Sequence, residues 1–417
     1  MSLQSEHALE LRRLRAFDEA ARQGSLVAAA GVLRVSQPAI SYLLNQLEAD
    51  VGCALLSRGA QGSRLTESGR LFHRRVLRCL QQVQDAVETV SGDLRSARRR
   101  DVAVSRITGT QCKSVLALWS FGSVRQAAER LGVSERAVVR PVQELERLLS
   151  VSLLQSSAHR AELTQAGREF ARRLGLASQE IWSAMEEVGG AQPSRKSLRI
   201  GALVLSPRLI LAEALEAALT QQPSCTVEII EGSYEELVVL LRDGSIDIIF
   251  GALRAPPPFS DLAETPLQAD PYVVVARRGH PLSKLKRIKV RDLAGYDFVF
   301  PTAGLRHEVL VNLIAQWKLA PKAQVHTSWL PTIIALIRSS DRLAVLSRWH
   351  VESDGTSDIQ SLDGLRVPHE GRYVGLTSRS SWLPTPFQEC FVNALQKITR
   401  LPASATHGQA SHRELYD

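Results

Sequence analysis

The sequence has few cysteines and no long apolar run, and both shortages limit what the protein can be. The five cysteines are odd in number and far apart in the 417 residues: Cys53, Cys79, Cys112, Cys225 and Cys390. This usage predicts free thiols rather than a disulfide framework. No run of 18 apolar residues exists, and the N-terminus shows no charged-then-apolar leader. We therefore expect a cytoplasmic protein without a membrane span.

Sequence motifs of catalysis and cofactor binding are also missing. The chain contains no Gly-x-Ser-x-Gly, no histidine or cysteine spacing typical of a metal site, and no glycine-rich phosphate loop. Its ten histidines are dispersed. We expect no enzyme activity, no metal and no cofactor.

What the chain has in excess is positive charge. The formal net charge is +8 and 44% of the residues are hydrophobic, which suits a polyanion partner and a protein of more than two domains with buried cores. The charge is uneven: residues 1–100 hold 15 arginines and 10 acidic residues, a net +5. Residues 101–190 hold 11 basic and 10 acidic residues, a net +1.

One passage occurs twice. Residues 24–72 and 122–170 align at a constant offset of 98 without a gap, and 18 of the 49 positions are identical. Shared composition does not produce so many matches, so one supersecondary unit has been duplicated.

The first copy has the pattern of a helix-turn-helix. An apolar helix from Leu11 ends at Gly24-Ser25, and Ser25 is placed to cap a second helix. After Val35, Ser36 is placed to cap a third helix with Pro38 in its first turn. Helical spacing leaves four polar or aromatic side chains of this third helix outward: Gln37, Ser41, Tyr42 and Asn45. Two helices joined by so short a turn are typical of DNA-binding proteins.

The next residues predict a wing and a long helix. Leu55-Leu56 and Leu65-Thr66 flank a basic, glycine-rich hairpin that would place Arg58 on a phosphate and Arg64 in a minor groove. Residues 69–94 form a helix with an apolar stripe: Leu71, Val76, Leu80, Val83 and Val87. Such a stripe is too apolar for solvent, so we expect it to pair with the same helix of a second chain.

Residues 11–94 resemble the winged helix-turn-helix and linker helix of LysR-type transcriptional regulators. The most specific matches are the run from Ser36 to Ser41 and the pair Leu47-Glu48, while Tyr42 stands where a basic residue is common. The resemblance implies double-stranded DNA as a partner and assembly as a dimer and then a tetramer. The expected DNA-binding residues are Ser36, Gln37, Pro38, Ser41, Tyr42, Asn45, Arg58 and Arg64.

The second copy, expected over residues 111–188, has lost the features of a reader. Glu135 replaces Gln37, and Pro141 lies inside the presumed recognition helix, where proline costs ~3 kcal/mol and introduces a kink. Ser156 and Glu162 replace the two wing arginines. A degenerate unit kept for packing or dimerisation is favoured over direct reading of DNA, although Arg136 and Arg140 remain candidates for backbone contacts.

The C-terminal half is an α/β domain. Two linkers precede it, a polar one from Ser91 to Thr110 and a glycine-containing one over residues 189–197. From Leu198 onward strands and helices alternate, in two successive units with a return to the first near Tyr373. This pattern predicts two lobes with parallel sheets over residues 198–400, followed by a disordered tail over 401–417.

Ligands of such sheets bind at the carboxyl ends of the strands. Three strand ends lead into helices through hydroxyl residues, and Arg306 lies one turn beyond one of them. The expected effector-binding residues are Leu205, Ser206, Thr302, Arg306 and Ser328. Helix ends and hydroxyls favour an anionic or polyhydroxyl ligand. The alternative is that these hydroxyl residues are simply helix caps.

This half resembles the LysR-type effector domain, which is similar in fold to periplasmic solute-binding proteins. The matches include Leu198–Gly201, Ile246-Asp247 and Gly279–Leu282. We therefore interpret the chain as a multidomain regulator, with a DNA-binding unit over 9–94, the degenerate second unit, and a domain that senses a small molecule. The alternative is a ligand-binding interaction protein whose winged helices serve mainly for assembly.

Overall fold

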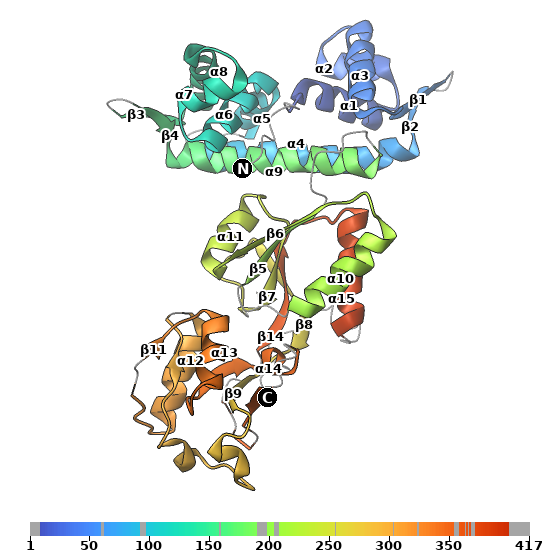
Figure 1. Cartoon of the computed structure of the whole chain (residues 1–417). Coiled ribbons are helices and arrows are strands. Elements are labelled where there is room, and N and C mark those ends of the chain that lie inside the picture. The colour runs from blue at the N-terminus through green and yellow to red at the C-terminus, as the bar shows by residue number, and fades with distance from the viewer. Residues whose placement is uncertain are drawn as a thin grey trace. The chain divides into compact units, whose positions relative to one another are not determined.

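The chain divides into two compact units, residues 1–195 and 196–417 (Figure 1). The computed structural model describes residues 9–59, 62–91, 97–157, 160–189, 198–203, 208–254, 256–302, 304–322, 325–353, 358–362, 364, 365, 367 and 372–399. The expected tail over 401–417 lies outside these residues.

The N-terminal unit begins with a winged helix. Its elements are α1 (Leu11–Gln23), α2 (Leu26–Leu33), α3 (Gln37–Val51), β1 (Leu56–Gly59) and β2 (Gly62–Leu65), and α4 (Glu67–Val90) follows directly. Ser25 caps α2 and Ser36 caps α3, each accepting a hydrogen bond from the backbone N–H three residues on. Helices α2 and α3 are bent by 105° to one another, within the range of a helix-turn-helix. The predicted motif is confirmed in both caps and turn.

The same series of elements then repeats. It comprises α6 (Gly109–Phe121), α7 (Val124–Leu131), α8 (Glu135–Leu149), β3 (Leu154–Ser157), β4 (Arg160–Leu163) and α9 (Gln165–Glu187). We call α1–β2 the first winged helix and α6–β4 the second winged helix. Pro141 does not end α8, which continues to the same length as α3.

The segment between the two winged helices differs from the expected polar linker, because residues Ala97–Arg106 form helix α5. Arg15 of α1 binds the C-terminal end of α5 by donating to the backbone oxygens of Val104, Ser105 and Ile107. Burial lowers the pKa of this guanidinium below its ordinary value. Helix α5 is therefore docked on the first winged helix, a contact that polar composition alone did not reveal.

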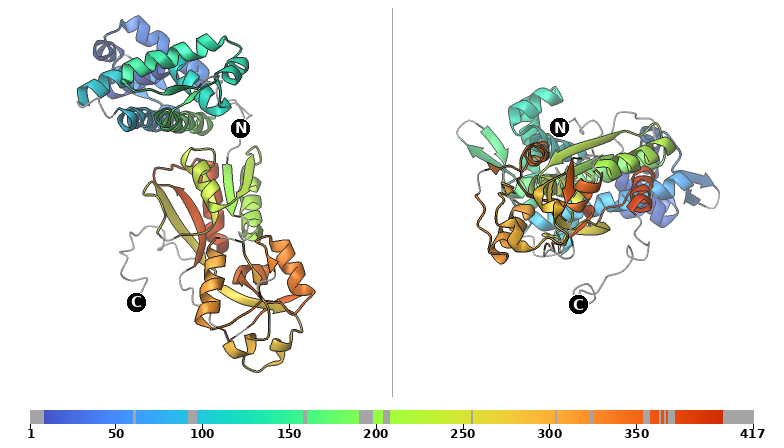
Figure 2. Two further views of the ribbon diagram at one scale, coloured as in Figure 1. Left: turned by 90° about the vertical axis from the view of Figure 1, so that its left-hand side faces the viewer. Right: turned by 60° about the horizontal axis from the view of Figure 1, so that its bottom comes forward.

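A single hydrophobic core runs through the N-terminal unit. It includes Phe17 and Phe72 from the first half and Val142 and Phe170 from the second. Helices α4 and α9 pack against each other along their length and cover one face of this core. Both winged helices lie on the same side of the pair (Figure 1). The pair is seen nearly end on in the left view of Figure 2. No single helix among the described residues is long and apolar enough to cross a membrane, although the bent pair α2–α3 passes by length and composition.

The first lobe of the C-terminal unit is built on a five-stranded sheet in the order β6-β5-β7-β14-β8. Its strands and helices are β5 (Leu198–Leu203), α10 (Arg208–Gln221), β6 (Val227–Gly232), α11 (Tyr234–Arg242), β7 (Ile248–Ala252), β8 (Leu262–Ala269), β14 (Tyr373–Arg379) and α15 (Pro386–Thr399). Strands β5, β6 and β7 are parallel as predicted, and the chain returns through β14 as predicted. Strand β14 is antiparallel to β7 and β8, and β8 was not anticipated.

The second lobe contains the remaining elements. They are β9 (Tyr272–Arg277), the 3-10 turns η1 (Pro281–Lys284) and η2 (Val290–Leu293), β10 (Val299–Phe300), α12 (Leu305–Gln316), β11 (Val325–His326), α13 (Leu330–Arg338), β12 (Ala344–Ser347), α14 (Arg348–Ser353) and β13 (Ile359–Ser361). The predicted parallel sheet is only partly right, because β9 is antiparallel to both β12 and β13. The parallel pair β10–β11 carries the predicted ligand residues at its ends.

Candidate DNA-binding and effector-binding sites

Helix α3 presents the side chains that the sequence assigns to DNA. Gln37, Pro38 and Asn45 are exposed, Ser41 is half-buried, and Tyr42 is 61% exposed. The Tyr42 hydroxyl accepts a hydrogen bond from Gln46 at 2.5 Å, one turn further along the helix. The opposite face, with Ile40 and Leu44, is buried in the core. Packing therefore fixes which side chains of α3 point outward.

The expected DNA contact Ser36 has a structural task as well. Its hydroxyl accepts from the Ala39 N–H at 3.4 Å and caps α3. This is the geometry of an N-cap residue, which also brings the helix N-terminus and its partial positive charge to the surface. Ser36 thus prepares the helix end that would meet a phosphate.

Glu48 joins α3 to the wing. Its carboxylate accepts hydrogen bonds from the backbone N–H groups of Leu55 and Leu56 at 2.8 and 3.0 Å. Gly69 closes the other end of the wing, because a Cβ atom there would lie 2.0 Å from the carbonyl oxygen of Leu55. Both residues belong to the motif that the sequence singled out: Glu48 holds the wing to α3, and Gly69 holds it to α4.

The wing itself is the antiparallel pair β1–β2, in which Arg58 is paired with Ser63 and Arg64 with Ser57. Arg64 is exposed. The side chain of Arg58 lies outside the described residues. The wing hairpin that the sequence predicts is present, and it carries both arginines on adjacent strands.

The second winged helix keeps the scaffold and changes the surface. Glu146 accepts from the N–H groups of Leu153 and Leu154 at 2.7 and 2.8 Å, as Glu48 does in the first. On the outward face of α8, Glu135 and Arg136 are exposed, and Arg140 pairs with Glu144 at 3.0 Å. The surface is charged but nearly balanced. The side chain of Ser156 lies outside the described residues, and Glu162 is exposed.

The apolar stripe of α4 has a different partner from the one expected. The sequence predicts pairing with α4 of a second chain, but Val76, Val83 and Val87 are fully buried within the single chain, against α9. Of the stripe, Leu71 remains 37% exposed and Leu80 is half-buried. The prediction was wrong because the duplicated helix supplies the apolar partner internally.

A buried ion-pair cluster fixes how α4 meets α9. Arg75, which is 2% exposed, donates to Glu187 at 2.5 Å and to Glu180 at 2.9 Å. Burial opposes the charge of Arg75, yet these hydrogen bonds raise its pKa above the ordinary value. Arg173 of α9, the counterpart of Arg75 in the repeat, donates to Gln82 at 3.1 Å and to Asp85 at 3.3 Å, both on α4.

In the C-terminal unit, Thr302 and Ser328 come together at the ends of β10 and β11. The Thr302 N–H donates to the Ser328 hydroxyl at 3.0 Å, and the two hydroxyls lie 2.8 Å apart. Neither residue caps a helix, since Gly304 and Trp329 occupy the N-cap positions of α12 and α13 without a side-chain cap hydrogen bond. For these two residues the helix-cap alternative is therefore wrong.

Arg306, the second residue of α12, is buried beside this pair. Its side chain is 6% exposed, and one terminal nitrogen reaches the Ser328 carbonyl at 3.5 Å. Its Nε and Nη1 atoms have no hydrogen-bond partner among the described residues. Burial lowers the pKa of Arg306 to about 10, an effect that neighbouring Tyr272 opposes and Arg372 reinforces. We call Thr302, Arg306 and Ser328 the anion site.

Two residues near this site were missed by the sequence analysis. Arg372, just before β14, stacks on the Tyr272 ring at 4.6 Å and donates to the Asp270 carboxylate at 2.5 Å. Asp270 lies in the segment between β8 and β9, and Arg372 lies in the segment before β14; these two segments connect the lobes. No local pattern marks Arg372, because its role depends on two strands that meet only in the fold. The predicted Leu205 and Ser206 lie outside the described residues.

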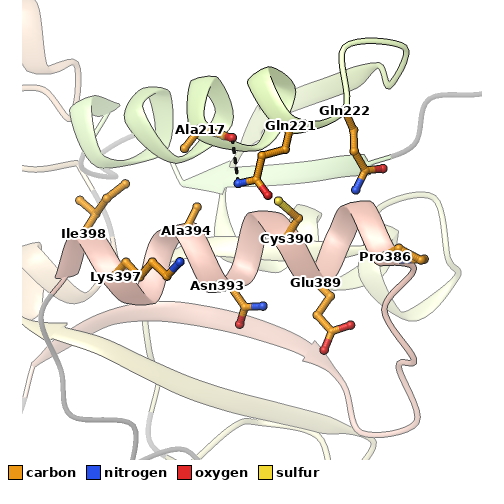
Figure 3. Close-up of a pocket in the computed structure, with 10 residues that line it drawn as sticks. All are labelled: Ala217, Gln221, Gln222, Pro386, Glu389, Cys390, Asn393, Ala394, Lys397 and Ile398. Atoms are coloured by element: carbon orange, nitrogen blue, oxygen red, sulfur yellow. Dashed lines mark hydrogen bonds between the residues drawn. The ribbon is translucent and has the colours of Figure 1, made fainter.

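A separate groove of about 490 Å³ lies between α10 and α15, whose helices run side by side in Figures 1 and 3. Its lining includes Gln221, Glu389, Asn393 and Lys397, and the Gln221 side chain donates to the Ala217 carbonyl at 3.4 Å. The described members of the expected effector set, Thr302, Arg306 and Ser328, do not line it. The groove and the anion site are thus built from different elements of the C-terminal unit.

Two family models match the chain. The model described as bacterial regulatory helix-turn-helix protein, LysR family, matches twice, at residues 11–70 and 110–168. The LysR substrate binding domain matches residues 191–399. Both winged helices thus match the same family model, whereas α5 and most of α4 and α9 lie between the matched ranges.

Two curated relatives and one solved structure are similar. The HTH-type transcriptional regulator GalR of Pseudomonas putida is 29% identical over 398 residues, which cover 93% of this chain and 97% of that protein. The HTH-type transcriptional regulator PcaQ of Agrobacterium fabrum is 28% identical over 269 residues, 63% of this chain and 86% of that one. A full-length OxyR variant from Pseudomonas aeruginosa shares the fold at 21% identity and a TM-score of 0.50, covering 69% of this chain and 94% of that one.

These matches decide between the two interpretations left open by the sequence. The relatives are transcriptional regulators, and the DNA-binding and ligand-binding models occur in the order that a regulator requires. The chain belongs to the LysR family of DNA-binding transcriptional regulators, with the effector-binding domain of that family as its C-terminal unit.

Proposed function

We propose that this regulator reads its operator with α3 and the wing β1–β2, and that an anionic effector bound at the anion site controls it. The reading residues would be Gln37, Ser41, Tyr42 and Asn45, with Ser36, Pro38, Arg58 and Arg64 against the backbone. This role is non-enzymatic and cytoplasmic, and it is supported by the regulatory relatives. Regulators of this family act as oligomers, and here the oligomer contacts would involve surfaces other than the buried stripe of α4.

The observation that carries the effector class is the buried guanidinium of Arg306, two of whose nitrogen atoms find no hydrogen-bond partner in the described part of the chain. An isolated buried charge is costly, and a partner of opposite sign removes most of that cost. A carboxylate or phosphate oxygen would accept from Arg306 and from the Thr302 hydroxyl. It would also lie near the uncapped N-terminus of α12, where the helix dipole favours negative charge.

A polyhydroxyl effector is the second candidate, because Thr302 and Ser328 offer two adjacent hydroxyls. It would leave the charge of Arg306 uncompensated. The anion is therefore the better match to the side chains of the site.

An effector at this site would act on the segments that connect the two lobes. Arg306 belongs to the second lobe, whereas Arg372 lies on the segment that leads back to the first. A bound anion would attract both guanidinium groups and so favour one arrangement of the lobes over another, which is what a ligand must do to shift a conformational equilibrium.

The test measures the thermal unfolding of the full chain with small monocarboxylates, dicarboxylates, inorganic phosphate and neutral sugars. We expect at least one anion class to raise Tm of the wild type, and Arg306→Gln to abolish this shift. Arg291→Gln, which changes an exposed arginine of η2, should keep it. A shift produced by neutral sugars alone, and unaffected by Arg306→Gln, would refute the anionic assignment.

A further inference from the structure

The two long helices of one chain form a closed antiparallel pair. Arg75 of α4 contacts Glu180 and Glu187 near the end of α9, whereas Arg173 near the start of α9 contacts Asp85. Residue numbers rise along one helix as they fall along the other, so the helices run in opposite directions. Each winged helix leads into the N-terminus of its own long helix, and the two therefore join opposite ends of the pair.

The length of the pair matches the repeat of DNA. Helix α4 has 24 residues and α9 has 23, which at 1.5 Å per residue is about 35 Å. The wing strands β2 and β4 therefore end roughly 35 Å apart, close to one turn of B-DNA. Both winged helices lie on the same side of the pair (Figure 1). A straight duplex that meets α3 in one major groove would thus meet the second winged helix one turn away.

The charges of the pair favour α9, and not a second α4, as the partner of α4. At the offset of 98, Glu180 corresponds to Gln82 and Glu187 to Thr89. In a pair of two α4 helices in this register, Arg75 would take the place of Arg173 and meet Gln82 and the single carboxylate of Asp85. Paired with α9, the buried Arg75 meets the two carboxylates of Glu180 and Glu187 instead, and a buried charge depends strongly on its partners. The carboxylates therefore favour α9 as the partner of α4.

The residues that the copies share are mostly those of the scaffold. Thr66 and Thr164 cap the long helices, accepting from the N–H groups of Gly69 and Gly167 at 2.9 and 3.0 Å. On the outward faces of α3 and α8 the copies differ: Gln37 against Glu135, Ser41 against Val139, and Tyr42 against Arg140. The second winged helix thus retains the shape of a DNA-binding module without its reading side chains.

We propose that the N-terminal unit of one chain binds DNA as a closed pair of unequal modules. The first winged helix reads bases in one major groove. The second contacts the DNA backbone one helical turn away and does not read bases. The binding partner of the second module is the sugar–phosphate backbone of the same duplex, met by Arg136 and Arg140. This inference rests on the proposed function of α3, and it predicts operators whose half-sites are unequal.

The first experiment tests whether the pair closes within one chain, and it needs no DNA. Gln82 and Arg173, whose side chains touch at 3.1 Å, are replaced by cysteine (Q82C with R173C) in the full chain, which is then oxidised. We expect a cross-linked monomer on a denaturing gel, with each single substitution as the control. A covalent dimer would show that α4 pairs between chains, and the inference would be overturned.

The second experiment is a hydroxyl-radical footprint of the full chain on its promoter DNA. We expect protected patches in pairs, about one helical turn apart on one face of the duplex. Base substitutions under one patch of each pair should lower affinity at least tenfold, and those under the other should change it less than twofold. Arg136→Ala with Arg140→Ala should erase the second patch and leave the first.

The outcomes separate this inference from the proposed function. A single patch per chain that responds to Gln37→Ala would leave α3 as the reader and refute contact by the second module. Two patches with equal base preference would refute the inequality of the modules. If the wild type binds DNA without any sequence preference, the proposed role of α3 is refuted instead.

Discussion

At the scale of the residue, neighbouring positions of α3 have different roles: some side chains hold the fold of the module, and others are available to contact DNA. Ser36 and Glu48 bind backbone groups of their own module, whereas Gln37 and Tyr42 point outward. The second copy keeps the residues that bind backbone groups and changes the outward residues. Each outward residue of α3 therefore has a matched position in α8, where the same substitution should have little effect on DNA binding.

Gln37→Ala should weaken binding to the cognate operator by ~1–3 kcal/mol and relax its base preference, because a side chain that reads a base edge is removed. Glu135→Ala, at the matched position of α8, should leave base preference unchanged. Competition binding with operator variants measures both. Equal effects of the two substitutions would contradict the assignment of α3.

Arg306→Met should stabilise the effector-free protein by roughly 1–3 kcal/mol, because it removes an incompletely paired buried charge. The pKa of Arg306 is lowered by burial to about 10, so the folded state disfavours the charged form. The penalty is fully present below pH 10 and declines as pH rises from there toward the ordinary pKa of a guanidinium, since the unfolded state then binds more protons.

Denaturant titrations of the wild type and Arg306→Met between pH 7 and 11 measure this difference. The gap in unfolding free energy should be constant up to about pH 9 and narrow above pH 10. A variant less stable than the wild type at pH 7 without effector would show that Arg306 already has its partner in the protein.

At the scale of the element, the wing is held to α3 by the Glu48 side chain and to α4 by close backbone approach. A Cβ atom on Gly69 would lie 2.0 Å from the Leu55 carbonyl oxygen, and one on Gly167 would lie 2.2 Å from that of Leu153. These contacts explain why glycine occurs at both positions of the repeat.

Gly69→Ala should lower the unfolding free energy of the N-terminal unit by about 1–3 kcal/mol, because the new Cβ would meet the Leu55 oxygen at 2.0 Å. Gly31→Ala is the matched control: no atom lies within 4 Å of its Cβ position inside α2, so helix propensity should raise stability by about 0.5–1 kcal/mol. Thermal unfolding of both variants, monitored by circular dichroism, tests the pair. A tolerated Gly69→Ala would mean that the wing is free to move away from α4.

Most elements were predictable because their signals are local. Ser25, Ser36 and the apolar period specified the helix-turn-helix. Other features depend on contacts between distant residues. Helix α5 owes its place to Arg15, some 90 residues before it. Likewise, the apolar stripe of α4 predicts that this face of the helix is buried, but it does not identify the helix that packs against it.

The candidate effector site was predictable in part for the same reason. Thr302, Arg306 and Ser328 follow the rule that ligands meet strand ends, and the fold brings them together. Tyr272 and Arg372 escaped because they approach from the segments that connect the lobes. The antiparallel pairing of β9 was missed because strand direction is not encoded in hydrophobic pattern.

At the scale of the whole molecule, the N-terminal unit is a single cooperative body. One core spans both winged helices, and the ion pairs of Arg75 and Arg173 join its halves. A defect at the junction of α4 and α9 should therefore be felt by both modules at once.

Arg75→Met should destabilise this unit by about 3–5 kcal/mol, because the buried Glu187 would lose its closest guanidinium, while Glu180 would still contact Arg78. Arg74→Gln, at a position 52% exposed that touches Glu187 at 3.5 Å, should change stability by less than about 0.5 kcal/mol. Hydrogen exchange should show faster exchange in α3 and α8 together for Arg75→Met. Faster exchange in only one module would mean that the halves unfold independently.

The covalent joining of α4 to α9 has a kinetic consequence. Two helices on separate chains meet at a rate set by how much protein the cell contains, whereas two helices of one chain meet at an effective concentration that does not depend on the amount of protein. The DNA-binding module of this chain should therefore assemble as soon as it is synthesised and stay assembled at the lowest copy numbers. Dilution that would separate the subunits of an ordinary dimer should leave this module intact.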